Sequence, residues 1–312
     1  MEGRVLRQEI DSRLSGIIDR DYVFLDLPYH TNIGDSLIYE GVMDYLRSVR
    51  HKCLYKTSLW TFDGRKIPEN VMILFNGGGN FGDLWMECTD FRNRIIRKYP
   101  HHKYLIFPQS AWYEDSNNLR QDVQLFSACD KMTICARDNA SYQLLKSHFT
   151  NNTILLVPDM AFHLPEKLFL PGKKSSGKTL FLRRSDKEYV QERGYSEVPE
   201  NAEVHDWPTL EKCTPPYLNW YRLEKVLKRS VGRLNKKAML YLTDAYWQKV
   251  LLPYNVREGI RFVKDYDRVY TTRLHTAVIA LLLGKEMHYY DNSYKKISAL
   301  FETWELPENN CL

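Results

Sequence analysis

Short apolar runs alternate with longer segments of helical periodicity along most of the chain. Runs that are apolar on both faces predict buried strands of the parallel kind. In the first half they lie at residues 22–27, 71–75, 104–107, 132–135 and 153–157. Helices are predicted between them, at residues 35–50, 88–99, 119–128 and 138–147. This alternation predicts a parallel sheet covered on both faces, a doubly wound α/β fold.

A second series of the same kind follows residues 164–178, which are rich in proline, glycine, lysine and serine and predict a linker. We expect strands at residues 179–182, 238–242, 269–272 and 287–290. We expect helices at residues 217–235, 247–264 with a break at Pro253, 276–283 and 293–304. Residues 185–216 are polar and could form a long flap. The predicted domains are residues 1–168 and 169–292, with a last helix in 293–312 that could pack back on the first domain.

Polar clusters follow the predicted strands of both halves. They lie at residues 32–35, 76–83, 159, 183–184 and 273–275. Ligands of open parallel sheets bind beyond the carboxyl ends of the strands, where all five clusters are expected. The pattern therefore predicts two lobes that face each other across a ligand-binding cleft.

The sequence Arg273-Leu274-His275 lies where a predicted strand enters an apolar helix. The first amides of a helix have no partners within it, and its dipole is positive there, so an anion is stabilised at this position. Arg273 adds a fixed charge, and His275 could donate or accept a proton. The alternative is that His275 caps the helix and Arg273 pairs with a nearby carboxylate.

The glycine-rich segment at residues 77–82 fits the pattern G-x-G-x-x-G after a strand, which raises the possibility of a dinucleotide site. That site also needs an acidic residue at the end of the next strand. The next strand ends at Phe107-Pro108-Gln109, which argues against a dinucleotide. The glycines could instead let the backbone approach a ligand or the opposite lobe, or form only a tight turn.

Two further clusters each have a functional and a structural interpretation. Asp35 could be a base for a sugar hydroxyl or the cap of its helix. Arg183 and Arg184 could bind a carboxylate or phosphate through paired N–H groups, or remain solvated. Since only one of two strand neighbours can face the cleft, we favour Arg183.

The composition of the chain indicates which classes of partner it could bind. The chain of 312 residues is 44% hydrophobic and 27% charged, as is usual for a soluble globular protein. Its formal net charge of +5 suits an anionic substrate or a membrane surface, and it contains no nucleic-acid motif. The basic segment at residues 222–237 could rest on anionic lipid, close to a lipid-linked acceptor.

The cysteines and histidines predict neither disulfides nor a metal site. The six cysteines form no Cys-x-x-Cys pair, which predicts reduced thiols, and no His-Glu-x-x-His pattern occurs. Residues 1–14 are charged, unlike a signal peptide, and no apolar run reaches the length of a bilayer span. We expect a cytoplasmic location, at most at the inner face of the membrane. Nothing in the sequence indicates an oligomeric state.

Several of these segments together resemble the polysaccharide pyruvyl transferase family. The resemblance is carried by Asn32-x-Gly34-Asp35, Gly77-Gly78-Gly79, Ala136-Arg137-Asp138 with Ser141, Pro158-Asp159, Arg183, Arg273-Leu274-His275 and Lys295 or Lys296 after Asp291. It runs over most of the chain, but residues 185–216 match nothing in it. It implies two Rossmann-like lobes of the glycosyltransferase-B type.

The resemblance also implies transfer of an enolpyruvyl unit from phosphoenolpyruvate to two hydroxyls of a sugar, as a cyclic ketal. His275 would be the general acid, and Asp35 would take the hydroxyl proton or orient the acceptor. Arg183 and Arg273 would bind the donor, together with the helix amides at Leu274 and His275, and Arg184 is a further candidate substrate-binding residue. The remaining candidate substrate-binding residues are Asn32, Gly34, Gly77, Gly78, Gly79, Asp159 and Lys295. No metal or redox cofactor would be needed.

Two alternatives remain open from the sequence. One is a sugar-nucleotide-dependent glycosyltransferase, which would share the lobes and the cleft. The other is a non-catalytic member of the fold that acts in polysaccharide assembly. The acceptor sugar, and whether a lipid or a nucleotide carries it, also stays open.

Overall fold

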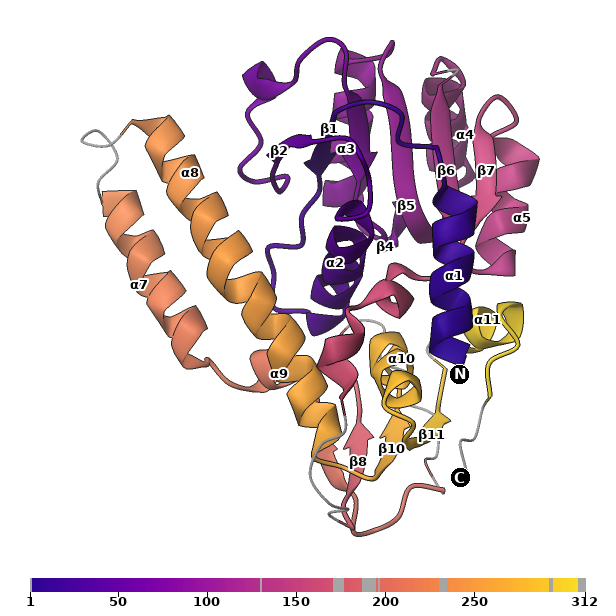
Figure 1. Ribbon diagram of the computed structural model, residues 1–312, viewed down its shortest axis with the longest axis vertical. Helices are drawn as coiled ribbons and strands as arrows, with labels where there is room; N and C mark the ends of the chain where they lie inside the picture. Colours follow the sequence, from indigo (N-terminus) through magenta and orange to yellow (C-terminus); the bar gives the residue numbers. More distant parts are fainter. Residues whose placement is uncertain are drawn as a thin grey trace. The chain divides into compact units, whose positions relative to one another are not determined.

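The computed structural model describes residues 2–129, 131–170, 177–186, 195, 197–229, 235–291 and 294–307 (Figure 1). The chain divides into two compact units. The first comprises Met1–Leu27, Gly41–Leu164 and Glu302–Glu305, and the second comprises Pro28–Glu40, Pro165–Phe301 and Leu306–Leu312. The domain boundaries expected at residues 168 and 292 stay predictions.

The first unit is built on a sheet of seven parallel strands. These are β1 (Tyr22–Leu25), β2 (Cys53–Lys56), β3 (Met72–Phe75), β4 (Gly78–Gly82), β5 (Lys103–Trp112), β6 (Met132–Ala136) and β7 (Thr153–Leu156). Their order is β2-β1-β3-β5-β6-β7, with β4 beside β5. All four residues of β3 are fully buried, as expected for a central strand covered on both faces.

Helices follow most strands of this sheet. They are α1 (Glu2–Leu14), α2 (Ile33–Leu46), α3 (Met86–Lys98), α4 (Ser116–Ser127) and α5 (Asn139–His148), with short 3₁₀ turns at Gly64–Lys66 and Met160–His163. The first turns of α2 belong to the second unit. The aromatic core of the first unit centres on Phe81, whose ring lies 5.8 Å from that of Phe126 and 5.7 Å from that of Phe149.

The second unit has a smaller parallel sheet. Its strands are β8 (Thr179–Leu182), β9 (Glu203–His205), β10 (Arg268–Thr271) and β11 (Glu286–Tyr289), in the order β11-β10-β8-β9. Its helices are α6 (Pro208–Glu211), α7 (Pro215–Arg229), α8 (Lys236–Tyr246), α9 (Leu252–Lys264), α10 (Leu274–Leu282) and α11 (Lys296–Thr303), with a 3₁₀ turn at Glu166–Phe169 and a π-helical turn at Trp247–Leu251.

The mixed α/β class with parallel strands is confirmed in both units. Helix α10 is buried on almost every side, with Ala277, Val278, Ile279 and Ala280 fully inaccessible, as its uniformly apolar sequence predicts. The arrangement of two lobes across a cleft stays a prediction. Parts of the predicted linker (171–176) and of the predicted flap (187–194 and 196) lie outside the described residues.

The strand expected at residues 238–242 is wrong, because this segment belongs to α8. Alanine, methionine and leucine are good helix formers, and the side chain of Asn235 accepts a hydrogen bond from the Lys237 amide at the start of the helix. A short apolar run cannot by itself distinguish a strand from a buried helical segment.

Two other expectations near Pro108 are also corrected. Strand β5 does not end at Pro108 but continues to Trp112, and the glycine run expected as a turn forms strand β4 beside it. The pairing of β5 with β6 shifts register between Ile106 and Gln109. A proline without an N–H is accommodated in a sheet at such an irregularity. Helix α1 and strands β2 and β9 were not predicted.

Gly82 provides a test of the contact between β4 and β5. Its φ is +105°, and a Cβ there would lie 1.8 Å from the Trp112 carbonyl oxygen. Gly16 also has a positive φ, +71°, but nothing lies within 4 Å of its Cβ position. Gly16→Ala should cost about 1 kcal/mol from backbone strain alone. Gly82→Ala should cost at least about 1 kcal/mol more, because the backbone of β5 must shift. Urea unfolding of both variants measures the difference, and equal costs would contradict the close approach.

Candidate functional site

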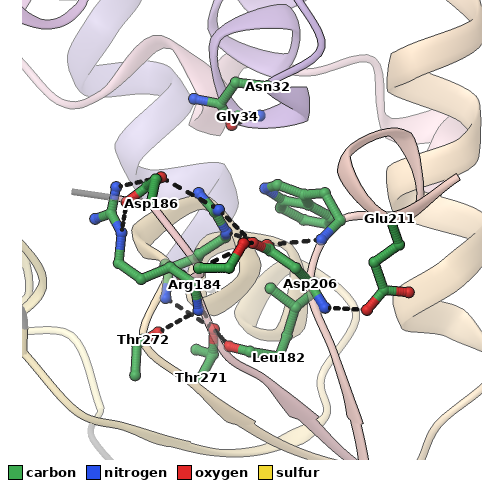
Figure 2. A network of polar contacts seen from close by, with 12 residues as sticks. Asn32, Gly34, Leu182, Arg184, Asp186, Asp206, Glu211, Thr271 and Thr272 are labelled. Atoms are coloured by element: carbon green, nitrogen blue, oxygen red, sulfur yellow. Dashed lines mark hydrogen bonds and ion pairs between the residues drawn. The ribbon is translucent and has the colours of Figure 1, made fainter. Parts of the chain in front are cut away.

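The carboxyl ends of β8, β9 and β10 carry a cluster of charged side chains in the second unit (Figure 2). Arg184, Ser185 and Asp186 follow β8, Asp206 follows β9, and Arg273 follows β10. Because parallel strands end at the same edge of the sheet, residues far apart in sequence meet here.

Asp206 and Arg273 form a buried two-point ion pair. Nε of Arg273 donates to Oδ1 of Asp206, and Nη2 donates to Oδ2 at 2.7 Å. Both side chains are only 6% exposed. Asp206 also accepts from the amide of Trp207 at 2.7 Å and from the amide and hydroxyl of Ser185 at 3.1 and 2.9 Å. These bonds stabilise a charge that would be costly to bury alone.

The sequence left open whether Arg273 binds an anion or pairs with a carboxylate, and the structure shows it paired. Asp186 adds a second carboxylate, 3.3 Å from Nη2 of Arg273. Nη1 of Arg273 makes no hydrogen bond with the residues that the structure describes. The pairing therefore fixes the plane of the guanidinium group and leaves one of its nitrogens for another partner.

Arg183 and Arg184 differ in their surroundings. Arg184 lies within the cluster: its guanidinium pairs with Asp186 at 2.7 and 3.0 Å, and its amide donates to the Thr272 hydroxyl at 2.9 Å. Arg183 is exposed, and its amide donates to the His205 carbonyl oxygen at 2.8 Å. The preference for Arg183 as the substrate-binding residue stays a prediction.

His275 lies in the first turn of α10 and contacts the first turn of α2. A Cβ at Gly34 would lie 2.5 Å from Nδ1 of His275, so only a glycine leaves room for the imidazole ring. Leu274, which begins α10, is buried. The starts of two helices therefore meet at this point, and the dipoles of both favour negative charge nearby.

The first turn of α2 is capped by Asn32 rather than by Asp35. The Asn32 side chain accepts a hydrogen bond from the Gly34 amide at 3.2 Å and donates to Asp35 Oδ2 at 2.8 Å. Nε2 of His30 lies 3.5 Å from the same oxygen. The Asp35 side chain is 28% exposed, so its carboxylate keeps access to solvent. The roles of Asp35 as a base and of Asn32 and Gly34 in substrate binding stay predictions.

Other residues of the second unit hold the start of α2 in place. Asn255 is fully buried in α9 and donates to the Ser36 hydroxyl at 3.0 Å. A Cβ at Gly259 would lie 2.4 Å from Cγ2 of Ile33, which shows how closely α9 approaches α2. The Thr209 hydroxyl donates to the carbonyl oxygen of Thr31 at 2.6 Å.

Lys295 immediately precedes α11, with a φ of +48°. Its carbonyl oxygen accepts from the Ala299 amide at 3.0 Å. The carboxylate of Asp291 caps the helix by accepting from the amides of Ile297 and Ser298 at 3.0 and 3.1 Å. These contacts explain the backbone conformation at the start of α11. A substrate contact of the Lys295 side chain stays a prediction.

The remaining predicted residues belong to the first unit. Gly77 and Gly78 are buried and Gly79 is half-buried, where β3 leads into β4. The side chain of Asn80 donates to the Asp26 carboxylate at 3.3 Å and accepts from Arg92 at 2.9 Å.

Asp159 is fully buried and pairs with Arg137 at 2.7 Å. Nε of Arg137 donates to Ser110, which in turn donates to Asp138 at 2.6 Å. This chain of bonds joins the carboxyl ends of β5, β6 and β7. It gives Asp159 a structural function in the first unit, whereas its expected contact with substrate stays a prediction.

Sequence patterns did not identify Asp206 or Asp186 as members of the site. The segment Asp206-Trp207-Pro208 does carry a signal of a strand end. The short run at residues 203–205 is followed by the carboxylate of Asp206, and Pro208 then begins a helix. The expected partner of Arg273 could have been sought there. Asp186 has no comparable signal.

The profile of the family described as polysaccharide pyruvyl transferase matches residues 32–294. The chain belongs to the polysaccharide pyruvyl transferase family. The Bacillus subtilis protein EpsO, provisionally named a pyruvyl transferase, is 34% identical over 95% of this chain and 90% of its own length. Pyruvyl transferase 1 of Schizosaccharomyces pombe is 26% identical over 90% of this chain and 68% of its own length.

A solved structure shares the fold of this pyruvyl transferase family member. The crystal structure of an uncharacterised protein of Klebsiella pneumoniae superposes with a TM-score of 0.65, covers 95% of this chain and 93% of its own, and is 23% identical. The similarities together do not favour the alternative of a sugar-nucleotide-dependent glycosyltransferase.

Neither a metal cluster nor a membrane span is found in the part of the chain that the structure describes. Within it, no group of three or more histidine, cysteine, aspartate or glutamate side chains is arranged to hold a metal ion. Each of the helices described above is too short or too polar to cross a bilayer.

The buried pair in the first unit can be tested against an exposed one. Asp159→Asn removes one charge of a fully buried pair and leaves Arg137 uncompensated, so the free energy of unfolding should fall by about 3–5 kcal/mol. Asp19→Asn removes the carboxylate from an exposed cluster with Arg20 and Lys103, and should cost less than about 1 kcal/mol. Denaturant unfolding measures both. If Asp159→Asn is as stable as the wild type, the ion pair has no structural function, and substrate binding remains as the function of Asp159.

Proposed function

We propose that the protein transfers a pyruvyl group from phosphoenolpyruvate to two hydroxyls of a sugar, forming a cyclic ketal during the synthesis of a polysaccharide. The contact of His275 with Gly34 carries this proposal. This contact brings the imidazole of His275, which we assign as the proton donor, beside the turn of α2 that bears Asp35. The names of the family and of EpsO support the transferred group, and the family name supports a polysaccharide acceptor.

The reaction needs an acid, a base and no redox step. His275 donates a proton to the methylene carbon of the enol, which leaves a cation-like centre at the carbon that bears the phosphate. One sugar hydroxyl attacks that carbon and loses its proton to Asp35. The second hydroxyl then attacks the same carbon, displaces inorganic phosphate to close the ring and returns a proton to His275. Because phosphate is the leaving group and no electrons are exchanged with a carrier, the proposal includes no metal or redox cofactor.

The donor carries a carboxylate and a phosphate, so its site must supply several positive groups. In the second unit these are Nη1 of Arg273, the exposed guanidinium of Arg183, and the amides at the start of α10. Asp206 and Asp186 both offset the charge of Arg273, but the two-point pair with Asp206 also holds the guanidinium group in a single orientation. A fixed donor loses less entropy on binding an anion than a mobile one.

The proposal is tested first at His275. His275→Ala should lower turnover by roughly 10²-fold or more, the usual scale for loss of a general acid. Labelled phosphoenolpyruvate would be incubated with a panel of glycosides that carry neighbouring or 1,3-related hydroxyls, and released phosphate would be measured with and without acceptor. His101→Ala removes an exposed histidine from the first unit and serves as the control. The proposal would be rejected if His275→Ala had wild-type turnover, or if phosphate were released at the same rate with and without an acceptor.

The position of the imidazole is tested separately at Gly34. Gly34→Ala introduces a Cβ that overlaps Nδ1 of His275, so the ring must move. A displacement of this size can cost on the order of 10²-fold in rate. We expect kcat to fall while KM for phosphoenolpyruvate changes little, since the arginines stay in place.

Gly284→Ala is the matched control for that experiment. Gly284 follows the other end of α10 with a φ of +62°, and nothing lies within 4 Å of its Cβ position. This variant should lose some stability and keep its kcat. If the two variants have the same kcat, the contact between His275 and Gly34 has no part in the reaction.

A further inference from the structure

Helices α7 and α8 lie side by side in the second unit (Figure 1). Aromatic side chains of the two helices contact each other where α8 ends. Tyr217 and Trp220 of α7 are buried. The ring of Trp220 lies 5.6 Å from that of Tyr246 and 5.9 Å from that of Trp247. The inner face of the pair is therefore occupied by the unit's own aromatic core, and the outer face is presented to solvent.

The exposed sides of both helices, which together we call the outer face, carry large apolar side chains. Leu218 and Tyr221 of α7 are 42% and 49% exposed, and Tyr241 of α8 is 63% exposed. Val226 and Leu242 are exposed as well. Single exposed apolar residues need no explanation, but several on one pair of helices mark a surface that binds something.

Both helices are strongly basic. The two helices contain six lysines and arginines but only two acidic residues, a formal excess of four positive charges next to +5 for the entire chain. Both acids are already engaged: Glu224 pairs with Lys228 at 2.9 Å, and Asp244 accepts from the Tyr29 hydroxyl at 2.7 Å.

Charged and apolar residues of α7 share one side of the helix. Arg222, Lys225 and Arg229 follow Leu218 at helical spacings of four, seven and eleven residues. All four side chains are exposed. Long basic side chains around an apolar residue are typical of helices that lie in the interface of an anionic membrane.

We propose that this outer face of α7 and α8 binds the surface of an anionic lipid bilayer. Lysine and arginine side chains would contact the headgroups, and Leu218, Tyr221 and Tyr241 would enter the interfacial region. A second copy of the chain would bring two faces of like charge together, which is unfavourable. A nucleic acid would satisfy the charges but would leave the aliphatic side chains in water. The inference goes beyond the proposed function, and its test does not measure catalysis.

The test is flotation of the full chain with vesicles. Vesicles of phosphatidylcholine alone are compared with vesicles in which phosphatidylglycerol replaces part of it. The protein should float with the anionic vesicles only, and binding should weaken with added salt. The variant Arg222→Gln/Lys225→Gln should bind at least about tenfold more weakly, since each basic residue near the surface contributes about fivefold. Leu218→Ser/Tyr241→Ser should also weaken binding, and this loss should persist at high salt.

The control removes the same charge elsewhere. Arg120→Gln/Lys131→Gln changes two exposed basic residues of the first unit and should bind anionic vesicles like the wild type. Circular dichroism confirms that each variant is folded. The proposal is overturned if the protein ignores anionic vesicles, or if both charge variants lose binding equally. Self-association that disappears in the α7 variant, without vesicle binding, would instead assign the face to a second copy.

Discussion

The ion pair between Asp206 and Arg273 organises the site end of the second unit. The strand order places β8 between β9 and β10, so the pair spans the end of the middle strand and ties the two outer ones together. Ser185, which follows that middle strand, donates twice to the same carboxylate. One acidic side chain thus joins the carboxyl ends of three strands. Because both charges are buried, removing either one would leave the other uncompensated.

Arg273 is also the N-cap residue of helix α10, two residues before His275. The Arg273 amide donates a hydrogen bond to the Thr271 hydroxyl at 2.9 Å, which restrains the backbone at this point. Two residues later, the imidazole of His275 fits against a helix start that has no Cβ at Gly34. The fixed arginine and the missing side chain together place a charged group and a titratable group within one turn of each other.

The sequence predicted the parallel α/β class, most strands and the clusters at their carboxyl ends, because buried parallel strands leave an unmistakable apolar run. It failed where local pattern and tertiary context disagree. Residues 238–242 read as a strand because they are apolar, yet they are helical under the cap of Asn235. The partner of Arg273 lies 67 positions away and follows a strand of only three residues. Register between distant strands is not encoded in either segment alone.

Both units have a buried arginine–aspartate ion pair at the carboxyl ends of their strands. In each, an arginine one or two residues after the end of a strand pairs with a buried aspartate: Arg137 with Asp159, and Arg273 with Asp206. An arginine after a parallel strand is therefore not by itself evidence of anion binding, since its charge can serve to join strands. Each guanidinium uses two of its nitrogens in these bonds: Nε and Nη1 of Arg137 bind Ser110 and Asp159, and Nε and Nη2 of Arg273 bind Asp206. The two sites differ in the helix that follows the arginine. The Asp138 carboxylate caps α5 by accepting from the Ser141 amide at 2.8 Å, whereas Arg273, the N-cap residue of α10, makes no side-chain capping bond. The first amides of α10 therefore favour an anion beside Arg273, and this position, rather than the ion pair, supports its assignment as a ligand.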